Sequence, residues 1–340
     1  MCASKVIAVD GMGGDNAPAA VVEGLAKFAS SAYHFIIFGN KNELDKYPFP
    51  PNLSYEIRHT EMAVTSDMEV MSALRSGKES SMGLAIQSVA SGEADAVVSS
   101  GNTSLYMALA KIIIKTIDGI DRPAIASIIP GKNGRTVCLD LGANAESNIK
   151  NMVDFAIMGE ALARSIFNKE KIKVALLNIG SEEVKGSRLV KKTSEILRKF
   201  MDGYVGFVEG DDFGKGNVDV IVTDGFTGNV ALKTIEGTAK YIVSELKTAL
   251  QSSTLAKIGG LLAMTSLSKL HNQMDPRLYN GAILVGLRGV VVKSHGNSDS
   301  IGFANALQFT INILNNNIFH RIREQLEKSK PYHDNKDNNS

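Results

Sequence analysis

The stretch Val6-Ile7-Ala8-Val9-Asp10-Gly11-Met12-Gly13-Gly14-Asp15-Asn16-Ala17-Pro18 decides the fold of this chain. Its apolar start is typical of a buried strand, and residues 19–28 are typical of a helix with Pro18 near the first turn. A strand, a glycine turn and a helix N-terminus make a place where backbone N–H groups can face an anion. The sequence therefore predicts an α/β unit with an anion site after its first strand.

Two carboxylates in this turn are unusual for a simple phosphate cradle. Asp10 and Asp15 either have a structural role, in which they cap the helix or order the loop, or they place a neighbouring cation. The residues by themselves leave both interpretations open.

Apolar runs alternate with longer helical stretches along most of the chain. Strands are expected at residues 5–9, 34–39, 53–58, 95–99, 124–129, 136–141, 173–179, 218–223 and 283–292. Helices are expected at residues 19–30, 81–91, 103–115, 149–167, 187–201, 229–250 and 304–328. This alternation predicts a three-layer α/β/α fold with a mostly parallel sheet covered on both faces.

Ligands of open parallel sheets bind beyond the carboxyl ends of the strands. Besides the first turn, five turns rich in Gly, Asn, Ser and Thr follow expected strands, at residues 100–103, 142–144, 180–182, 224–229 and 293–299. We expect all six turns at one edge of the sheet, where they form a polar crevice rich in N–H groups.

Composition excludes several classes of function. The formal net charge is +1, aromatic residues make up 6% and Trp is absent, so a nucleic-acid partner is disfavoured. Cys2 and Cys138 cannot form a disulfide framework or a cysteine metal site, which fits a reducing compartment. Without a signal core or an apolar run of about 18 residues, we expect a cytoplasmic protein.

Common catalytic and nucleotide motifs are absent from the sequence. There is no G-x-x-x-x-G-K-[ST] loop, no G-x-G-x-x-G fingerprint and no G-x-S-x-G elbow. The histidines lack metal-ligand spacing, and only His295 lies in a glycine turn after a strand. A structural or capping role for His295 remains open.

The segment 246–274 contains no Asp or Glu but carries Lys247, Lys257 and Lys269, with Leu, Ile and Met at helical spacing. Three interpretations remain open: two helices packing in a core or dimer seam, a basic amphipathic hairpin on an anionic bilayer, or one wall of an acyl-chain groove. Residues 329–340 are expected to form a disordered tail.

Several motifs follow one another in a specific order along the chain. They are Asp10 to Pro18, Ser100-Gly101-Asn102-Thr103, Leu139 to Asn144, Leu176 to Glu182 with Lys185-Gly186, Asp224 to Asn229, Tyr279 to Ala282, and Ser294-His295-Gly296. Together they resemble the PlsX family of acyl-acyl-carrier-protein:phosphate acyltransferases. The resemblance spans about residues 5 to 328 and is highly specific in the order of its motifs.

The resemblance implies a fold and a setting. The fold is that of phosphotransacetylases and isocitrate/isopropylmalate-dehydrogenase-like proteins, with residues 1–328 forming one catalytic α/β unit of two lobes. The family is usually dimeric, and its product passes to a membrane glycerol-3-phosphate acyltransferase. We therefore expect a homodimer at the inner face of the membrane, which favours the bilayer interpretation of residues 246–274.

The resemblance also implies a reaction between acyl carrier protein bearing an acyl thioester and inorganic phosphate. This reaction needs no covalent nucleophile, no metal and no cofactor, but it needs an anion site and donors for an oxyanion.

We expect the phosphate site to include Asp10, Gly13, Gly14, Asp15 and the turn formed by Ser100, Gly101, Asn102 and Thr103. Asn144 and Asn229 are expected to donate amide hydrogens to phosphate or oxyanion. Lys185 is expected to provide a counter-charge, although a solvated lysine at a helix start is the alternative. His295 is expected to donate to the oxyanion or to the leaving sulfur.

Two positions depart from the family pattern. Ser104 replaces the usual Gly after Ser-Gly-Asn-Thr, and Asp211 replaces the Arg of a common Glu-Gly-Arg, so residues 209–211 are not assigned to phosphate binding. Two other functions stay open: a phosphotransacetylase that uses acyl-coenzyme A, and a non-catalytic membrane scaffold. The missing dinucleotide fingerprint disfavours a dehydrogenase.

Overall fold

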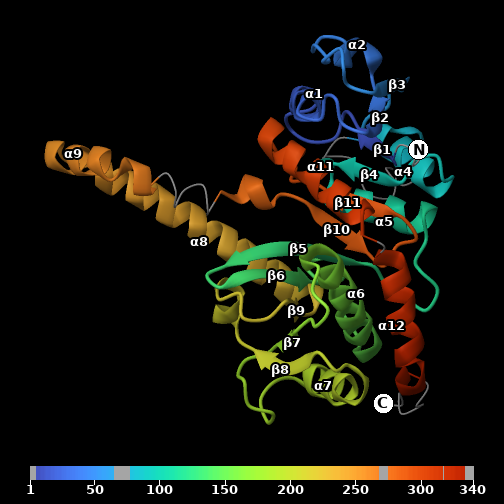
Figure 1. The fold of residues 1–340 in the computed structure, drawn as a ribbon, viewed down its shortest axis with the longest axis vertical. Helices are drawn as coiled ribbons and strands as arrows, with labels where there is room; N and C mark the ends of the chain where they lie inside the picture. Colours follow the sequence, from blue (N-terminus) through green and yellow to red (C-terminus); the bar gives the residue numbers. More distant parts are fainter. Residues whose placement is uncertain (1–4, 65–76, 268–274, 317, 334–340) are drawn as a thin grey trace.

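One mixed sheet runs through the part of the chain that the structure describes, with eleven strands in the order β3-β2-β1-β4-β11-β10-β5-β6-β9-β7-β8 (Figure 1). This computed structural model describes every residue except 1–4, 65–76, 268–274, 317 and 334–340. The strands are β1 (Lys5–Asp10), β2 (Tyr33–Gly39), β3 (Tyr55–His59), β4 (Ala96–Ser99), β5 (Ala124–Gly131), β6 (Gly134–Leu139), β7 (Val174–Leu177), β8 (Tyr204–Val208), β9 (Val220–Val222), β10 (Ala282–Val285) and β11 (Val290–Lys293).

Helices cover both faces of this sheet. The α-helices are α1 (Ala19–Ala26), α2 (Lys41–Leu44), α4 (Ser81–Ala90), α5 (Thr103–Ile113), α6 (Ile149–Phe167), α7 (Arg188–Phe200), α8 (Gly225–Gln251), α9 (Thr254–Leu262), α11 (Ser300–Leu314) and α12 (Ile318–His333). Short 3₁₀ helices are η1 (Gly77–Glu79), η2 (Gly210–Gly214) and η3 (Pro276–Tyr279).

The alternation of side chains along β1 divides the core into two layers. Ile7 and Val9 belong to a cluster with residues of α1, α6, α11 and α12, whereas Ala8 belongs to a cluster with residues of α4 and α5. The first half of α8 packs on this second cluster through Leu232 and Ile235. Because successive strand residues face opposite sides, a strand covered on both faces is apolar throughout. The predicted three-layer α/β/α fold is confirmed.

The sheet consists of two parallel groups that run in opposite directions. β1, β2, β3, β4 and β11 are mutually parallel, and β6, β7, β8 and β9 are mutually parallel. Between them, β10 and β5 pair antiparallel with their neighbours and reverse the direction. The expectation that all six polar turns share one sheet edge is therefore wrong, because three follow each group.

Three expected elements differ from those in the structure: two are each divided into two elements, and one turn is helical. The run 283–292 is two strands, β10 and β11, because Gly286 has a φ of +99° and the chain reverses there. The expected helix 304–328 is two helices, α11 and α12. The turn expected at 224–229 is already helical after Asp224, which caps α8 by accepting a hydrogen bond from the backbone N–H of Thr227 at 2.9 Å. β8 was not expected at all.

The C-terminal ends of the acid-free segment and of the predicted tail lie outside the described residues. Within 246–274, the end of α8 and the helix α9 form a hairpin that projects from the body of the molecule (Figure 1), and residues 268–274 lie outside the described part. In the predicted tail, α12 continues through His333, so the disorder expected for residues 329–333 is wrong; residues 334–340 are not described. No helix among the described residues is long and apolar enough to cross a membrane.

Candidate active site

Asp10 organises the first turn from inside the protein. Its side chain is buried and accepts hydrogen bonds from the hydroxyls of Ser81 and Ser99, each at 2.6 Å, and from the backbone N–H of Met12 at 3.3 Å. Burial raises the pKa of Asp10, while these hydrogen bonds act to lower it. Of the two interpretations of this carboxylate, loop ordering accounts for these contacts.

Glycines allow the first turn to pack closely against the turns after β4 and β11. A Cβ on Gly13 would lie 2.2 Å from Asp10 Oδ2 and 2.8 Å from the backbone nitrogen of Gly101. Gly14 has a φ of +105°, and a Cβ there would lie 2.8 Å from Cβ of Ser100. The backbone N–H of Asp15 donates to the carbonyl of Gly296 at 2.8 Å. The turns after β1, β4 and β11 thus meet; we call residues 10–16, 99–103 and 293–298 the β1/β4/β11 loops.

The second turn also begins a helix. Asn102 caps α5, because its side-chain oxygen accepts from the backbone N–H of Leu105 at 3.1 Å. Thr103 and Ser104 are exposed in the first turn of that helix. This side-chain oxygen of Asn102 is therefore already engaged by the protein, and the helix N-terminus points its free N–H groups toward the loops.

The turns after β6 and β9 form a second group around Asp140. This buried carboxylate accepts from the backbone N–H groups of Ala143 at 2.9 Å and Asn144 at 2.8 Å. The side-chain nitrogen of Asn144 donates to Pro123 O and to Asp140 Oδ2, each at 2.9 Å. Both amide hydrogens of Asn144 are thus engaged, and donation to phosphate would require one of them to be released. We call residues 140–144 and 224–229 the β6/β9 loops.

Asn229 occupies the solvent side of the β6/β9 loops. It is exposed on the first turns of α8, and its amide nitrogen lies beside Gly142, where a Cβ would come within 2.6 Å of it. Gly142 has a φ of +119°, so a side chain there would be strained as well as crowded. Glycine at position 142 therefore allows the Asn229 amide to approach the turn after β6.

Helix α8 links the two loop groups. Nε2 of His295, in the β1/β4/β11 loops, lies 3.9 Å from Oε1 of Glu236 on α8. Asn229 and Glu236 are seven residues apart, so they share one helix face about 10 Å apart. The reversal in the sheet separates the loops, and α8 brings Asn229 and His295 to one side of the molecule.

The environment of His295 favours its neutral form. Partial burial lowers the pKa of this imidazole, Glu236 opposes the change, and Lys293, Lys233 and Lys240 reinforce it. Glu236 is shared, because it also accepts a hydrogen bond from Lys233 at 2.9 Å. A neutral imidazole can donate a hydrogen bond to an oxyanion without adding a full charge.

Lys185 lies in a third place, the loop after β7. Its side chain is half exposed and forms an ion pair with Glu182 at 2.8 Å, which raises the pKa of Lys185. Asn178 shapes this loop by donating to the carbonyls of Gly180 and Lys185. Among the described residues, Lys185 has no hydrogen bond or ion pair with either loop group. Asp211, the second departure from the family pattern, is exposed and pairs with Lys215 at 2.8 Å.

One cation of the site was missed by the sequence prediction. Lys293 ends β11, is only 8% exposed and donates to the carbonyls of Ser100, at 3.2 Å, and Ser294. Burial lowers the pKa of Lys293 to about 8, and the charges of Asp10 and Asp15 act in the other direction. A signal was present, since Lys293 is a charged residue directly after an apolar run and before a Ser-His-Gly turn.

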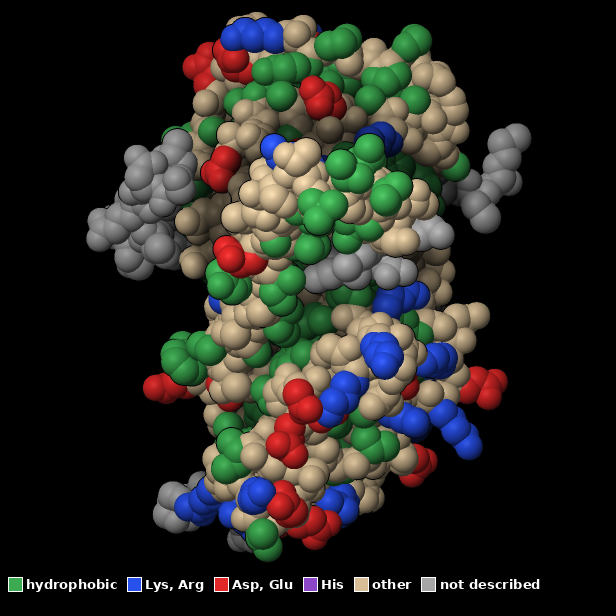
Figure 2. Space-filling model, turned by 90° about the vertical axis from the view of Figure 1, so that its left-hand side faces the viewer, with side chains coloured by type: hydrophobic (Ala, Val, Ile, Leu, Met, Phe, Trp, Pro, Cys, Tyr) green, Lys and Arg blue, Asp and Glu red, His purple; other side chains and the backbone are tan. Residues whose placement is uncertain are grey.

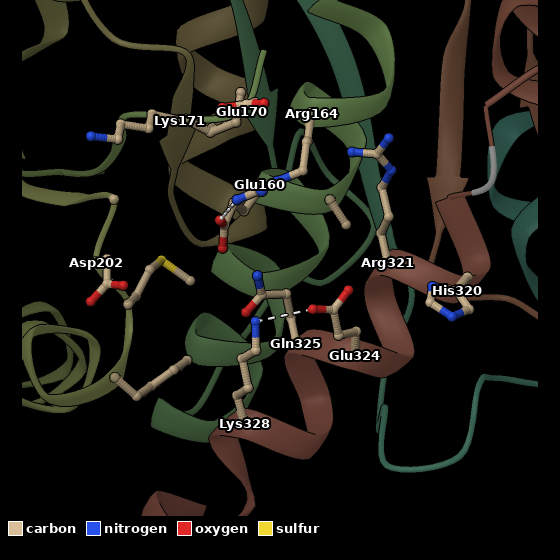
Figure 3. Close-up of a pocket in the computed structure, with 15 residues that line it drawn as sticks. Glu160, Arg164, Glu170, Lys171, Asp202, His320, Arg321, Glu324, Gln325 and Lys328 are labelled. Carbon is tan, nitrogen blue, oxygen red and sulfur yellow. Dashed lines mark hydrogen bonds and ion pairs between the residues drawn. The ribbon is translucent and has the colours of Figure 1, made fainter. Parts of the chain in front are cut away.

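A cavity of about 830 Å³ lies apart from these loops, between α6, α12 and the chain that joins α7 to β8. Its lining carries charges of both signs, several of which are paired (Figure 3). Arg164 pairs with Glu160, and Lys328 pairs with Glu324. Because these charges neutralise one another, the cavity offers no focused field for an anion, and we place the candidate site at the loops instead.

Comparisons with known proteins point in one direction. A profile of the family described as "Fatty acid synthesis protein" matches residues 5–321. A phosphate acyltransferase of Rhodospirillum rubrum is 48% identical over 335 residues, covering 96% of each chain. A phosphate acyltransferase of Pelagibacter ubique is 44% identical over 331 residues, covering 95% of this chain and 99% of the relative.

Solved structures with low sequence identity share the fold. A phosphotransacetylase from Streptococcus pyogenes is similar with a TM-score of 0.61 at 19% identity, covering 92% of this chain and 95% of that one. A branched-chain phosphotransacylase from Enterococcus faecalis is similar with a TM-score of 0.57 at 14% identity, covering 92% and 99%. These likenesses support the predicted fold class.

Proposed function

The chain belongs to the phosphate acyltransferase family, and we propose that it transfers a fatty acyl group from acyl carrier protein to inorganic phosphate, giving acyl phosphate for phospholipid synthesis. Family membership supports acyl transfer to phosphate in lipid synthesis. The carrier-protein donor and the phospholipid pathway come from the motif resemblance.

The chemistry asks for positioning more than for a nucleophilic side chain. A phosphate oxygen attacks the thioester carbon, a C–O bond forms, the C–S bond breaks, and the proton of phosphate passes to the departing sulfur or to water. Phosphate is already anionic near pH 7, and a thiol with a pKa of about 8.5 leaves readily as thiolate. The site must hold phosphate ~3–3.5 Å from the carbon and stabilise the oxyanion.

The observation that carries this proposal is the convergence of the β1/β4/β11 loops, in which Asp10 bonds to the turns after β1 and β4, and Asp15 and Lys293 join these turns to the turn after β11. Glycines 13, 14 and 101 bring three backbones together, as an anion cradle requires. In the proposed site, these loops hold phosphate. The Asn229 amide faces the acyl group from the start of α8, and His295 faces it from beside Glu236, two turns further along the same helix. Lys185 is proposed as a counter-charge for the substrate, which requires release from Glu182.

The test compares donors directly. The purified protein is incubated with acyl-acyl-carrier-protein or acyl-coenzyme A, with and without phosphate, and acyl phosphate is trapped with hydroxylamine. We expect phosphate-dependent loss of the acyl group from the carrier protein. Faster turnover of acyl-coenzyme A would instead identify a phosphotransacetylase. Binding to liposomes without turnover of either thioester would identify a scaffold.

Two substitutions test the catalytic assignments. His295→Ala and Lys185→Ala are each expected to lower kcat/KM at least tenfold while leaving the melting temperature within a few degrees. If both variants keep the activity of the unmodified protein, these two roles are wrong and the family assignment still stands.

The projecting hairpin of α8 and α9 supports a further part of the proposal, peripheral membrane contact. Leu255 and Leu262 are 80% and 82% exposed, and hydrophobic side chains gather on the hairpin where it faces the viewer in the upper middle of Figure 2. Lys247 and Lys257 add positive charge, and the described part of the hairpin beyond Leu246 has no acidic residue.

An apolar groove also runs between the two helices of the hairpin. Val243, Leu246, Leu250 and Leu261 line part of a hollow of about 510 Å³. We propose that this surface rests on an anionic bilayer, where the acyl phosphate product would enter the membrane and reach a glycerol-3-phosphate acyltransferase. A homodimer seam at the same surface is the competing proposal.

A further inference from the structure

Lys293 is a buried cation at the meeting point of the β1/β4/β11 loops. Its Nζ donates to the carbonyl of Ser100, from the turn after β4, and to the carbonyl of Ser294 in its own turn. An ammonium group has three N–H donors. One of them joins the turn after β4 to the end of β11, a second is used within Lys293's own turn, and the third has no acceptor among the described residues.

The charge of Lys293 is not matched by a carboxylate in contact. Among the described residues, no Asp or Glu oxygen lies within 4.0 Å of the Lys293 Nζ, the distance that defines an ion pair. Asp10 and Asp15 are near enough for their charges to act on Lys293, but the Asp10 oxygens are occupied by two serine hydroxyls and backbone N–H groups. A buried cation without a contacting anion is destabilising unless a ligand supplies the charge.

A second, independent observation points to a ligand at the same place. Ser100 is 4% exposed, and its Oγ has no hydrogen-bond partner among the described residues. This serine is the residue whose carbonyl accepts from Lys293, and its Cβ lies against Gly14. Buried hydroxyls are nearly always hydrogen-bonded, so an orphan beside a cation indicates a missing acceptor.

Lys185 contrasts with Lys293 in each of these respects. Its charge is paired with Glu182, its side chain is half exposed, and it lies in the loop after β7, which follows the other parallel group of strands. A buried lysine without a contacting carboxylate can interact more strongly with an anion than an exposed lysine that must first leave its partner, so Lys293 is the stronger candidate for contact with phosphate itself.

We propose that Lys293 is the residue whose ammonium binds the phosphate substrate, with the Ser100 hydroxyl donating to the same phosphate. The inference rests on the proposed function, since it assigns the cation of the phosphate site. Phosphate bound there would satisfy the third ammonium hydrogen and the orphan hydroxyl together. Lys293 would also help to hold the loops in place, because its hydrogen bond to the Ser100 carbonyl already joins the turns after β4 and β11.

The assignment predicts a large effect of removing the charge on phosphate binding and a small effect on stability. Lys293→Met keeps the length and burial of the side chain but removes the charge. The lost hydrogen bonds and the relief of a buried charge act in opposite directions, so the melting temperature is expected to change by only a few degrees, whereas phosphate binding weakens at least tenfold. A purely structural lysine, needed to neutralise Asp10, would give the reverse pattern.

The experiment measures inorganic phosphate binding by isothermal titration calorimetry and the phosphate KM in the acyl-transfer assay. The matched control is Lys111→Met, at an exposed lysine in the last turn of α5, which is expected to change neither quantity. Ser100→Ala is expected to weaken phosphate binding several-fold with little change in stability. A Lys293→Met protein that melts lower but binds phosphate as before would overturn the proposal.

Failure of this inference can be told apart from failure of the proposed function. If the unmodified protein binds phosphate through Lys293 but transfers no acyl group from either thioester, the proposed function fails and the assignment of Lys293 holds. If it makes acyl phosphate and Lys293→Met leaves the phosphate KM unchanged, the assignment fails and the function holds.

Discussion

The side-chain oxygen of Asn280 accepts a hydrogen bond from the backbone N–H of His295 at 3.0 Å. The amide nitrogen of Asn280 donates to the hydroxyls of Ser294 at 2.9 Å and Ser298 at 2.8 Å. Asn280 precedes β10 and His295 follows β11, and the antiparallel pairing of these strands brings the two residues together. One buried side chain thus fixes the turn that carries both Lys293 and His295.

Asn280→Ala should therefore impair the reaction more than it impairs folding. The change leaves one backbone N–H and two hydroxyls without this partner, which costs about 1–3 kcal/mol, and it frees the turn. We expect kcat to fall at least tenfold and the KM for the acyl donor to change less than threefold, measured by steady-state kinetics.

Asn305→Ala provides a matched control for this prediction. Asn305 donates to the carbonyls of Arg277 and Ile301 in the same neighbourhood, but among the described residues it forms no hydrogen bond with the 294–298 turn. A similar loss of stability without loss of kcat is expected. Equal losses of kcat in both variants would contradict a positioning role for Asn280.

Gly13→Ala should disrupt the first turn. An added Cβ would lie 2.2 Å from Asp10 Oδ2, well inside contact distance, so either the turn or the carboxylate must move. We expect activity to fall at least a hundredfold and the melting temperature to drop by several degrees. Gly237→Ala is the control, because a Cβ there meets nothing within 4 Å and alanine favours a helix by roughly 0.5–1 kcal/mol.

Asp154 should make stability depend on pH. Burial raises its pKa from the ordinary 3.8 to about 6, although Lys150 donates to it at 2.7 Å. The folded protein therefore binds a proton more tightly than the unfolded chain between these values, and stability falls as the pH rises through that range. Above about pH 6, the full cost of burying the charge is present.

Asp154→Asn removes this dependence. The free energy of unfolding is measured by urea denaturation for both proteins. The value for the variant minus the value for the unmodified protein should increase by roughly 2–3 kcal/mol from pH 4 to pH 7. A constant difference at both pH values would show that Asp154 titrates normally in the folded protein.

The hairpin surface should determine membrane binding. Leu255→Asp with Leu262→Asp places two charges on its most exposed apolar positions. We expect loss of co-sedimentation with phosphatidylglycerol liposomes and unchanged turnover of a soluble acyl donor. Ile112→Asp is the control, because Ile112 is 52% exposed on α5, away from the hairpin. Dissociation of a dimer by the double variant, with liposome binding retained, would favour the dimer seam.

Sequence reasoning predicted the parts of the site that depend on local sterics. The strand, glycine turn and helix of the first motif lie where expected, because Gly13 and Gly14 leave no room for another residue and the apolar run must be covered on both faces. The same reasoning placed Ser100 and Gly101 beside the first turn, since β1 and β4 are parallel neighbours.

Other features were invisible in the sequence because they depend on distant partners. The run 283–292 is apolar throughout, and nothing local shows that it folds into two antiparallel strands that help to reverse the sheet. The six turns therefore divide into two groups, which periodicity could not predict. Lys185 and Lys293 both follow strands, and only packing shows that one is solvated and the other buried.

The sequence by itself determined the alternation of strands and helices, the glycine turns and the family, because each depends on residues that are neighbours in the chain. Only the tertiary structure decided which polar groups share a site. Asn280 meets His295, and α8 carries Glu236 to the same imidazole, through contacts between segments that are far apart along the chain. The burial of a side chain and the charges around it depend on all of these contacts, so both are established only when the whole sheet has assembled.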